Sequence, residues 1–112
     1  MSESDRQFVI RATQLVINNI DVTDFNINML CQEMAMSRTL FYSRLKSLTG
    51  KAPQEFIRII RLQKAAELLK EGKNVTEVAV ETGFVNTKYF SSLFKKQFGT
   101  QPSKYQQNDS SQ

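Results

Sequence analysis

Two stretches of this chain carry basic and hydroxyl side chains without any carboxylate. Residues 34–54 and residues 82–108 contain neither Asp nor Glu. Their cations are Arg38, Arg44, Lys46 and Lys51 in the first stretch and Lys88, Lys95, Lys96 and Lys104 in the second. Cations of this kind neutralise phosphate groups, and short Ser and Thr side chains allow a helix to approach a polyanion closely. Because the net charge of +4 is mild, it is the segregation of charge that favours a polyanionic partner.

The first stretch predicts a helix that presents these side chains outward. It runs over residues 38–48, with Ser37 as its N-cap and Gly50 as its stop. We place Phe41 at the centre of the buried side and advance about 100° per residue. The outward residues are then Thr39, Ser43 and Lys46, with Tyr42 on the shoulder.

The second stretch predicts an equivalent helix over residues 87–98, between the N-cap Asn86 and Gly99. Here Phe90 and Phe94 are buried. The outward residues are Lys88, Ser92 and Lys95, with Ser91 on the shoulder. Both outer faces match a helix that enters the major groove of duplex DNA.

A longer helix joins these two elements. Residues 51–72 predict one helix of about 18 residues, because Pro53 suits its first position and Gly72 its end. Its apolar residues are Phe56, Ile59, Ile60, Leu62, Ala65, Ala66 and Leu69. A face this wide packs on both neighbours rather than on one. At 1.5 Å per residue the helix spans roughly 27 Å, and the offset of each unit from the helix end brings the roughly 34 Å of one turn of DNA within reach.

The remaining segments also predict helices. They run over residues 5–20, 27–34, 75–83 and, as a last short turn, 102–105. No segment alternates polar and apolar residues for long enough to predict a strand. The sequence therefore predicts an all-α fold of seven helices, in which two helix-turn-helix subdomains are joined by a long central helix. The expected boundaries are 5–50, 51–72 and 73–107, with disordered ends at 1–4 and 108–112.

An internal repeat relates the two subdomains. Phe41 corresponds to Phe90 at an offset of 49, and Ala35 corresponds to Gly83 at an offset of 48. The second copy therefore has one extra residue in its turn, near Val85. Each copy is a short helix, a tight turn and a longer capped helix, which is a helix-turn-helix unit. We expect Gly83 to need a positive φ or a close approach of helices.

Enzymatic chemistry has little support in this sequence. There is no histidine, no carboxylate pair in an apolar setting, no phosphate-binding Gly-rich loop and no metal-ligand cluster. The single cysteine, Cys31, excludes an internal disulfide and is expected to be a packed, inert thiol. We therefore expect no enzyme activity, cofactor or metal. The alternative to DNA binding is a helical protein-interaction module that binds an acidic partner, with a much weaker dependence on salt.

One charged residue lies on the apolar central helix. Arg61 stands among apolar neighbours. We expect it to be a structural ion-pair partner of Glu81 or Glu33 rather than a reader of bases.

The second half of the chain resembles the DNA-binding domain of the AraC/XylS family of bacterial transcription regulators. The matching residues are 79–84 (AVETGF), 89–99 (YFSSLFKKQFG) and 102–105 (PSKY). Residues 36–38 and 45–50, together with residues 61–62 and 65–69 of the central helix, extend the resemblance over roughly residues 5–106. The chain departs from the family at Gln106, where Arg is frequent, and at Ala52 and Gln101, where Ser is favoured. The departure at Gln106 removes an expected phosphate contact.

The resemblance implies which residues contact DNA. In the family the second helix of each unit reads the duplex, so it implies two reading sets. They are Arg38, Thr39, Tyr42, Ser43 and Lys46 in the first unit and Thr87, Lys88, Ser91, Ser92 and Lys95 in the second.

The resemblance also implies a setting. It is greatest to the output domains of hybrid two-component regulators, in which a membrane sensor kinase and a receiver precede this domain. It implies a monomeric domain in the bacterial cytoplasm, on the nucleoid and tethered to the membrane through other parts of a longer chain. The implied partners are double-stranded DNA and RNA polymerase, with no membrane contact by this domain and any dimerisation through regions outside it.

Overall fold

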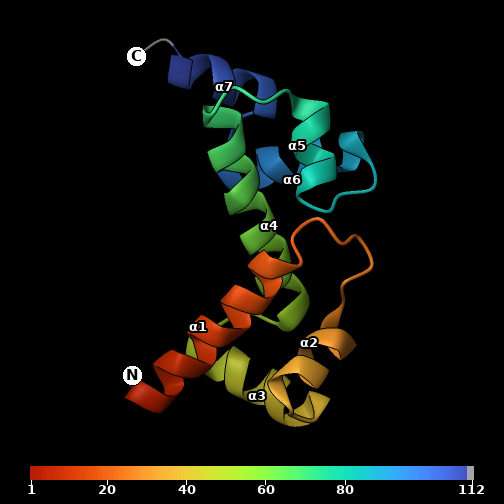
Figure 1. Cartoon of the computed structure of the whole chain (residues 1–112). Coiled ribbons are helices and arrows are strands. Elements are labelled where there is room, and N and C mark those ends of the chain that lie inside the picture. Colours follow the sequence, from red (N-terminus) through yellow and green to blue (C-terminus); the bar gives the residue numbers. More distant parts are fainter. Residues whose placement is uncertain (111–112) are drawn as a thin grey trace. The chain divides into compact units, whose positions relative to one another are not determined.

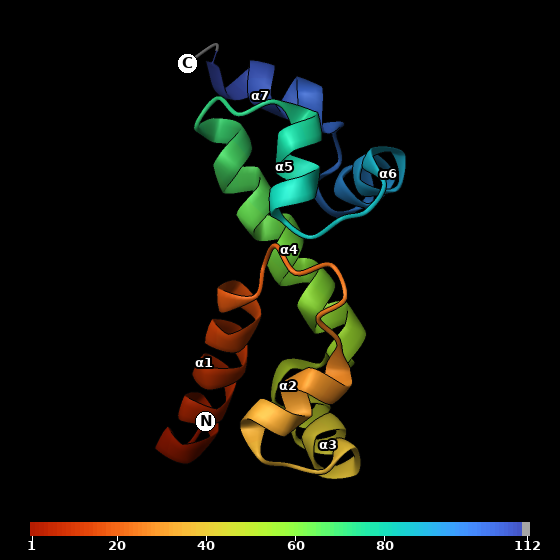
Figure 2. The same ribbon diagram turned by 45° about the vertical axis from the view of Figure 1, so that its right-hand side comes forward.

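The computed structural model describes residues 1–110, with the side chains of residues 1–106, and over that range it holds seven α-helices and no strand (Figures 1 and 2). The helices are α1 (Glu3–Asn18), α2 (Ile27–Met34), α3 (Arg38–Thr49), α4 (Pro53–Lys70), α5 (Val75–Glu81), α6 (Thr87–Phe98) and α7 (Pro102–Ser110). The predicted all-α fold is confirmed. No helix within the described residues is both long enough and apolar enough to cross a bilayer.

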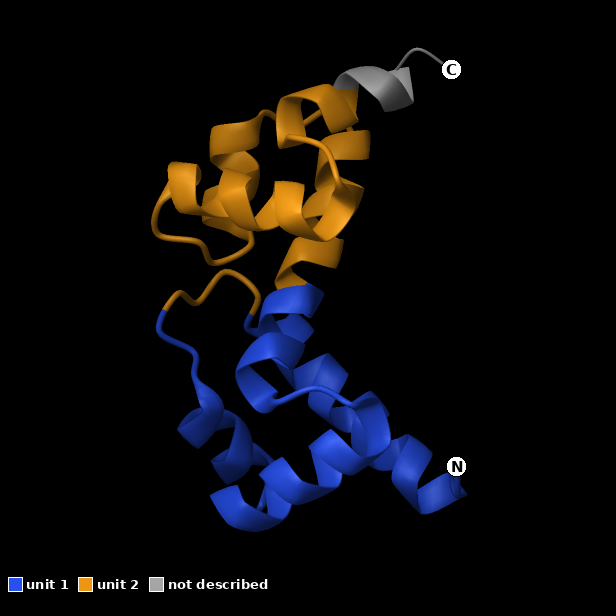
Figure 3. Ribbon diagram, turned by 180° about the vertical axis from the view of Figure 1, so that it is seen from behind, with its two compact units in different colours: residues 1–19, 24–60 blue, residues 20–23, 61–112 orange. Residues whose placement is uncertain are grey.

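The chain folds into two compact units, each with its own core (Figure 3). Unit 1 comprises residues 1–19 and 24–60, and unit 2 comprises residues 20–23 and 61–112. Helix α4 contributes to both units, because the division falls between Ile60 and Arg61.

Unit 1 is built from α1, α2, α3 and the first part of α4. Helix α1 packs against α2 and α3, and the Phe8 ring lies 5.6 Å from the Phe41 ring between their centroids. Leu30, Phe41 and Leu45 are fully shielded from solvent. Burial of side chains this large contributes on the order of 2 kcal/mol each, so this small core holds the turn between α2 and α3.

Unit 2 has a core centred on a row of aromatic rings. The neighbouring ring centroids of Phe84, Phe90 and Phe94 lie 5.0 and 5.8 Å apart, and Phe94 also lies 4.5 Å from Phe98. The aliphatic residues packed with them are Leu62, Ala65, Ala66, Leu69, Val78 and Ala79, from α4 and α5. The predicted burial of Phe90 and Phe94 is thus confirmed.

Side chains cap the helices where the sequence predicts caps. In each case an oxygen of the cap residue accepts a hydrogen bond from the backbone N–H three residues later. The predicted caps Ser37 and Asn86 do so, and Asn26, Asn74 and Ser2 act in the same way for α2, α5 and α1. Such caps satisfy amides that would otherwise lack a partner in the first turn, so they fix where each helix begins.

The two ends of the fold are longer than predicted. The sequence predicts that residues 1–4 are disordered. This prediction is wrong for Ser2, Glu3 and Ser4, since α1 begins at Glu3 and Ser2 is its N-cap. The sequence predicts that the last helix ends near Tyr105. This prediction is wrong, since α7 runs to Ser110. Helix α7 therefore includes residues 108–110 of the predicted C-terminal end, whereas residues 111–112 lie outside the described residues.

Arg61 is not the ion-pair partner that the sequence predicts. Its guanidinium donates hydrogen bonds to three backbone carbonyls of unit 2, those of Ile20 at 2.6 Å, Thr82 at 2.9 Å and Val22 at 3.0 Å. Glu81 instead pairs with Lys73 at 3.0 Å. Burial lowers the pKa of Arg61, and the nearby charge of Asp21 opposes that shift. Arg61 therefore ties residues 20–23 to the turn after α5.

Candidate nucleic-acid interface

Helix α3 displays the first predicted reading set to solvent. Arg38, Thr39, Tyr42, Ser43 and Lys46 are all exposed, and the opposite face is anchored by the buried Phe41 and Leu45. The amphipathic spacing that buries one face necessarily turns the other outward. The outer face of α3 thus offers two cations, two hydroxyls and a phenol without a carboxylate.

Helix α6 displays the second set in a similar way. Lys88, Ser92 and Lys95 are exposed, whereas Thr87 and Ser91 are half-buried. The buried side of the helix consists of Phe90 and Phe94. Thr87 and Ser91 therefore offer less surface to a partner than their counterparts Arg38 and Tyr42 offer in unit 1.

A shallow groove runs along α3 beside the beginning of α4. Its lining includes four of the five residues predicted on α3, namely Arg38, Thr39, Tyr42 and Ser43. The other lining residues are Ile27, Ala52, Pro53 and Gln54. Lys46 is not among them. The groove places the amide of Gln54, whose exposed side chain the sequence pattern did not single out, beside the polar groups of α3.

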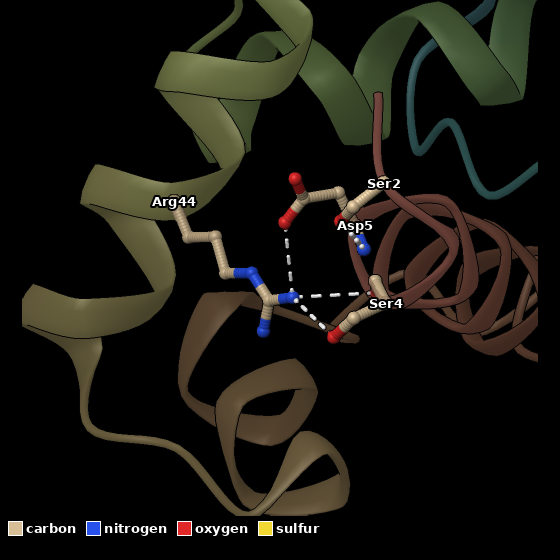
Figure 4. A network of polar contacts seen from close by, with 4 residues as sticks. All are labelled: Ser2, Ser4, Asp5 and Arg44. Carbon is tan, nitrogen blue, oxygen red and sulfur yellow. Dashed lines mark hydrogen bonds and ion pairs between the residues drawn. The ribbon is translucent and has the colours of Figure 1, made fainter.

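Arg44 fixes the position of α3 against α1 (Figure 4). Its guanidinium lies 3.2 Å from a carboxylate oxygen of Asp5 and donates to the backbone and hydroxyl oxygens of Ser4, each at 3.3 Å. It also stacks over the Phe8 ring, 4.4 Å from the centroid. Although Arg44 belongs to the acid-free stretch, these contacts make it a positioning residue within unit 1 rather than a free cation.

The lysines on the outer faces of α3 and α6 differ from Lys51 and Lys73, which are paired with carboxylates. Lys51 lies near the end of the first stretch and is paired with Glu55 at 3.4 Å. Lys73 lies outside both stretches, and its hydrogen bond with Glu81 raises its pKa. No salt bridge is found for Lys46, Lys88 or Lys95 among the described side chains. Their charges remain available to a polyanion.

Cys31 is a buried free thiol, as predicted. Burial raises its pKa, and the positive charge of Arg38 only partly offsets that effect. A thiol held in its protonated form is a poor nucleophile, so packing rather than reactivity accounts for this residue.

Two exposed apolar residues on these helices were not predicted from the sequence. Leu40 on α3 is 62% exposed and Tyr89 on α6 is 57% exposed. The helical pattern places both residues on the flank of the outer face, and neither belongs to the reading sets that the sequence predicts. Their correspondence in the repeat, at an offset of 49, was the signal that could have identified them.

Comparison with known proteins gives concordant matches. A family model described as a helix-turn-helix domain matches residues 30–108. A histidine kinase from Formosa agariphila is 37% identical over 113 residues, which cover 100% of this chain and 8% of the kinase. The chain spans between 8% and 61% of the length of several curated relatives that it matches.

Two solved structures share both fold and sequence with this chain. The C-terminal domain of AraT, a response regulator from Geobacillus stearothermophilus, is 27% identical with a TM-score of 0.81, over 90% of this chain and 84% of that domain. The DNA-binding domain of AdpA, a global transcriptional factor in complex with a target DNA, is 29% identical with a TM-score of 0.78. That match covers 96% of this chain and 93% of the AdpA domain.

Proposed function

The chain belongs to the AraC-type helix-turn-helix family of DNA-binding transcription regulators, and on this premise we propose that α3 and α6 read two successive major grooves of duplex DNA. The chain is a sequence-specific DNA-binding domain that acts in transcription regulation. The family is one of regulators and not a class of enzymes.

One observation carries this proposal. The outer faces of α3 and α6 are both exposed, both basic and both free of carboxylates, on helices that the internal repeat relates to one another. A solvated charged face on a single helix is commonplace, but its repetition in two separately packed units is not expected without a shared ligand. The grooves of DNA offer phosphates for the lysines and base edges for the hydroxyls.

We assign different roles to the cations. Lys46 and Lys95 lie in the last turns of α3 and α6 and are proposed to contact phosphate. Arg38 and Lys88 lie in the first turns of their helices, where recognition helices contact base edges. Alanine at Arg38 or Lys88 should relax preference at particular base pairs by about 1–3 kcal/mol, whereas alanine at Lys46 or Lys95 should weaken binding to all sequences alike.

The test uses a double variant and a charge-matched control. Lys46→Ala with Lys95→Ala removes two charges from the proposed faces. Arg6→Ala with Lys64→Ala removes two charges that are paired elsewhere, with Glu3 and Glu67. Fluorescence anisotropy with a duplex of about 20 base pairs measures the affinity of each. The first variant should bind many-fold more weakly than the second, and equal losses would refute the assigned faces.

The salt dependence of binding separates DNA from an acidic protein partner. Contact with about five phosphates predicts a slope near −4 to −5 in a plot of log affinity against log salt. Loss of both Lys46 and Lys95 should make that slope shallower by about 2. A nearly flat salt dependence would favour the protein-interaction alternative.

We further propose that one chain suffices for both grooves. Helix α4 is continuous from Pro53 to Lys70 and contributes to both units, so a single chain carries two linked reading helices. The isolated domain is then a monomer on DNA, and any dimerisation comes from regions outside it. Sedimentation of the complex should give one chain per duplex.

The wider setting of the domain is also a proposal. The kinase match covers the whole of this chain but 8% of the kinase, and the AraT match is the C-terminal domain of a response regulator. We propose that this chain is the output domain of a larger signal-responsive regulator in the bacterial cytoplasm, tethered to the membrane by other parts of that protein. Contact with RNA polymerase belongs to the same proposal.

A further inference from the structure

Leu40 and Tyr89 are large hydrophobic residues whose side chains are mostly exposed to solvent. Each is the third residue of its helix, α3 or α6, and each is more than half exposed. In both helices the next residue, Phe41 or Phe90, is fully buried. The exposure therefore follows from the direction of the helix face and not from fraying of the first turn.

The local structure around the two residues is the same. The backbone N–H of Leu40 donates to the hydroxyl of Ser37 at 3.2 Å, and that of Tyr89 donates to the side-chain oxygen of Asn86 at 2.9 Å. Both side chains therefore leave the same point of a capped first turn. Leu40 and Tyr89 are thus structurally equivalent within their own units.

No other exposed large hydrophobic residues of the described chain are paired in this way. The remaining ones are Met1, Ile10, Ile17, Met29, Tyr42, Val80 and Val85. At the offsets of the repeat, Met29 corresponds to Glu77, Tyr42 to Ser91 and Val80 to Gln32. An apolar group kept in solvent at the same place in both units indicates a ligand that both units share.

The surroundings of Leu40 and Tyr89 indicate what that ligand presents. Both lie within the acid-free stretches and one residue from Thr39 or Lys88, which are proposed to face the duplex. The apolar group exposed in the major groove is the C5-methyl group of thymine. A cationic surface with an apolar side chain at its N-terminal end fits a thymine-containing groove better than an acidic protein.

We propose that Leu40 and Tyr89 each contact the methyl group of a thymine in the groove that its helix enters, and so set a preference for thymine at one position in each half of the site. This inference rests on the proposed function, because it requires α3 and α6 to lie in major grooves. It adds to that function two specificity-determining residues and the base that each selects.

The experiment replaces thymine by uracil, which differs only by the loss of this methyl group. A duplex of about 20 base pairs, recovered by selection from random sequences, is rebuilt with uracil at one thymine position at a time. Wild-type protein should lose affinity about fourfold at one position in each half, as expected for one methyl group returned to water. In Leu40→Ala the loss at the first-half position should vanish while the second-half loss remains. Tyr89→Ala should show the reverse.

Conservative variants keep the test specific. Leu40→Met and Tyr89→Phe retain an apolar surface and should retain the uracil effect. Because both positions are exposed, thermal unfolding of all four variants should match wild type, which establishes that they fold. A uracil effect that persists at both positions in the alanine variants, or no uracil effect in wild type, overturns the inference. Failure to recover any bound duplex would instead refute the proposed function.

Discussion

At the scale of single residues, Gly83 and Arg61 depend on each other. Gly83 has a φ of +86°, and a side chain there would overlap the Arg61 guanidinium and lie 2.6 Å from the carbonyl oxygen of Ile20. The turn after α5 thus needs glycine for two reasons, its backbone conformation and the space that Arg61 occupies. Of the two reasons expected for glycine at position 83, a positive φ or a close approach of helices, the positive φ is confirmed.

Replacement of Gly83 should therefore be costly. Gly83→Val combines left-handed strain with displacement of a buried guanidinium, and we expect a loss on the order of 3 kcal/mol or more in unfolding free energy. Gly72→Ala is the matched control, because Gly72 has a φ of +94° but nothing within 4 Å of an added Cβ. It should cost only about 1–2 kcal/mol. Urea denaturation measures both, and equal losses would show that the Arg61 site is not rigid.

At Ala35, in the equivalent turn of unit 1, we expect a substitution to glycine to raise stability, opposite to the loss expected when Gly83 is replaced. Ala35 adopts a φ of +57°, the one non-glycine residue of the described chain with a positive φ. Since glycine occupies this place in the other copy, Ala35→Gly should stabilise the protein by roughly 0.5–1 kcal/mol, as relief of strain outweighs the added chain entropy. Ala35→Val should destabilise it. Thermal unfolding would contradict this reasoning if Ala35→Gly proved the less stable protein.

At the scale of elements, Asp5 joins α1 to α3 in a manner that depends on pH. Hydrogen bonding with Ser2, and then with Arg44, lowers the pKa of Asp5 from its ordinary value of 3.8. A carboxyl group whose pKa is lower in the folded state stabilises the fold above its unfolded pKa and loses that effect as pH falls through the folded pKa. The contribution is therefore complete at neutral pH and is lost below about pH 4.

The corresponding measurement compares wild type with Asp5→Asn across pH. The melting temperature of wild type should be the higher one at pH 7, and the difference should shrink as the pH falls below about 4. Glu3→Gln is the control, because the Glu3 carboxylate faces an exposed Arg6 at 3.6 Å and does not contact α3. A difference between wild type and Asp5→Asn that stays constant with pH would mean that the charge of Asp5 does not hold α1 to α3.

Gln106 has a structural role in unit 2, which differs from the phosphate contact expected of the Arg that is frequent here in the family. Its amide nitrogen donates to the carbonyl oxygens of Leu69 at 3.1 Å and Lys73 at 2.7 Å. It thus links α7 to the last turn of α4, where the Leu69 carbonyl also accepts from the Gly72 N–H at 3.1 Å, and to Lys73 in the loop that follows. A family pattern with Arg at this place directed attention to DNA, whereas the contacts here are internal to unit 2.

Gln106→Glu tests this contact with almost no change in shape. A carboxylate cannot donate a hydrogen bond, so at pH 7 the variant should lose about 1–3 kcal/mol of unfolding free energy. As pH falls through the pKa of the new carboxyl group, its protonated form regains one donor and the deficit should narrow. Urea unfolding at pH 7 and pH 4 measures both values. Wild-type stability in Gln106→Glu at pH 7 would show that the two hydrogen bonds are not needed.

At the scale of the whole molecule, the sequence predicts the elements better than it predicts how they are held. Helix bounds followed from local signals, such as Ser37 and Gly50 around α3, and the burial of Phe41 and Phe90 followed from spacing. The hydrogen bonds of Arg61 could not be predicted in the same way. They join backbone carbonyls 21 to 41 residues away, and a carbonyl has no sequence signature.

The candidate interface shows the same division. Exposure of residues such as Lys46 and Lys88 followed from the helical period, since a buried Phe41 or Phe90 fixes the opposite face. The exposure of Leu40 was not predicted, because the sequence pattern alone does not distinguish an exposed apolar residue on the flank of a helix from a core residue.

The proposal that one chain spans two grooves makes a prediction about the spacing of the site. Selection from random duplexes should return two short blocks about 10 base pairs apart, one for α3 and one for α6. Insertion of 5 base pairs between the blocks turns the second block by about half a turn of DNA, so a single chain can no longer place both helices in their grooves. Affinity should then fall to that of a duplex with one block, while substitutions in the spacer that keep its length should have little effect. Undiminished affinity after the insertion would mean that the two units bind independently, each through its own helix.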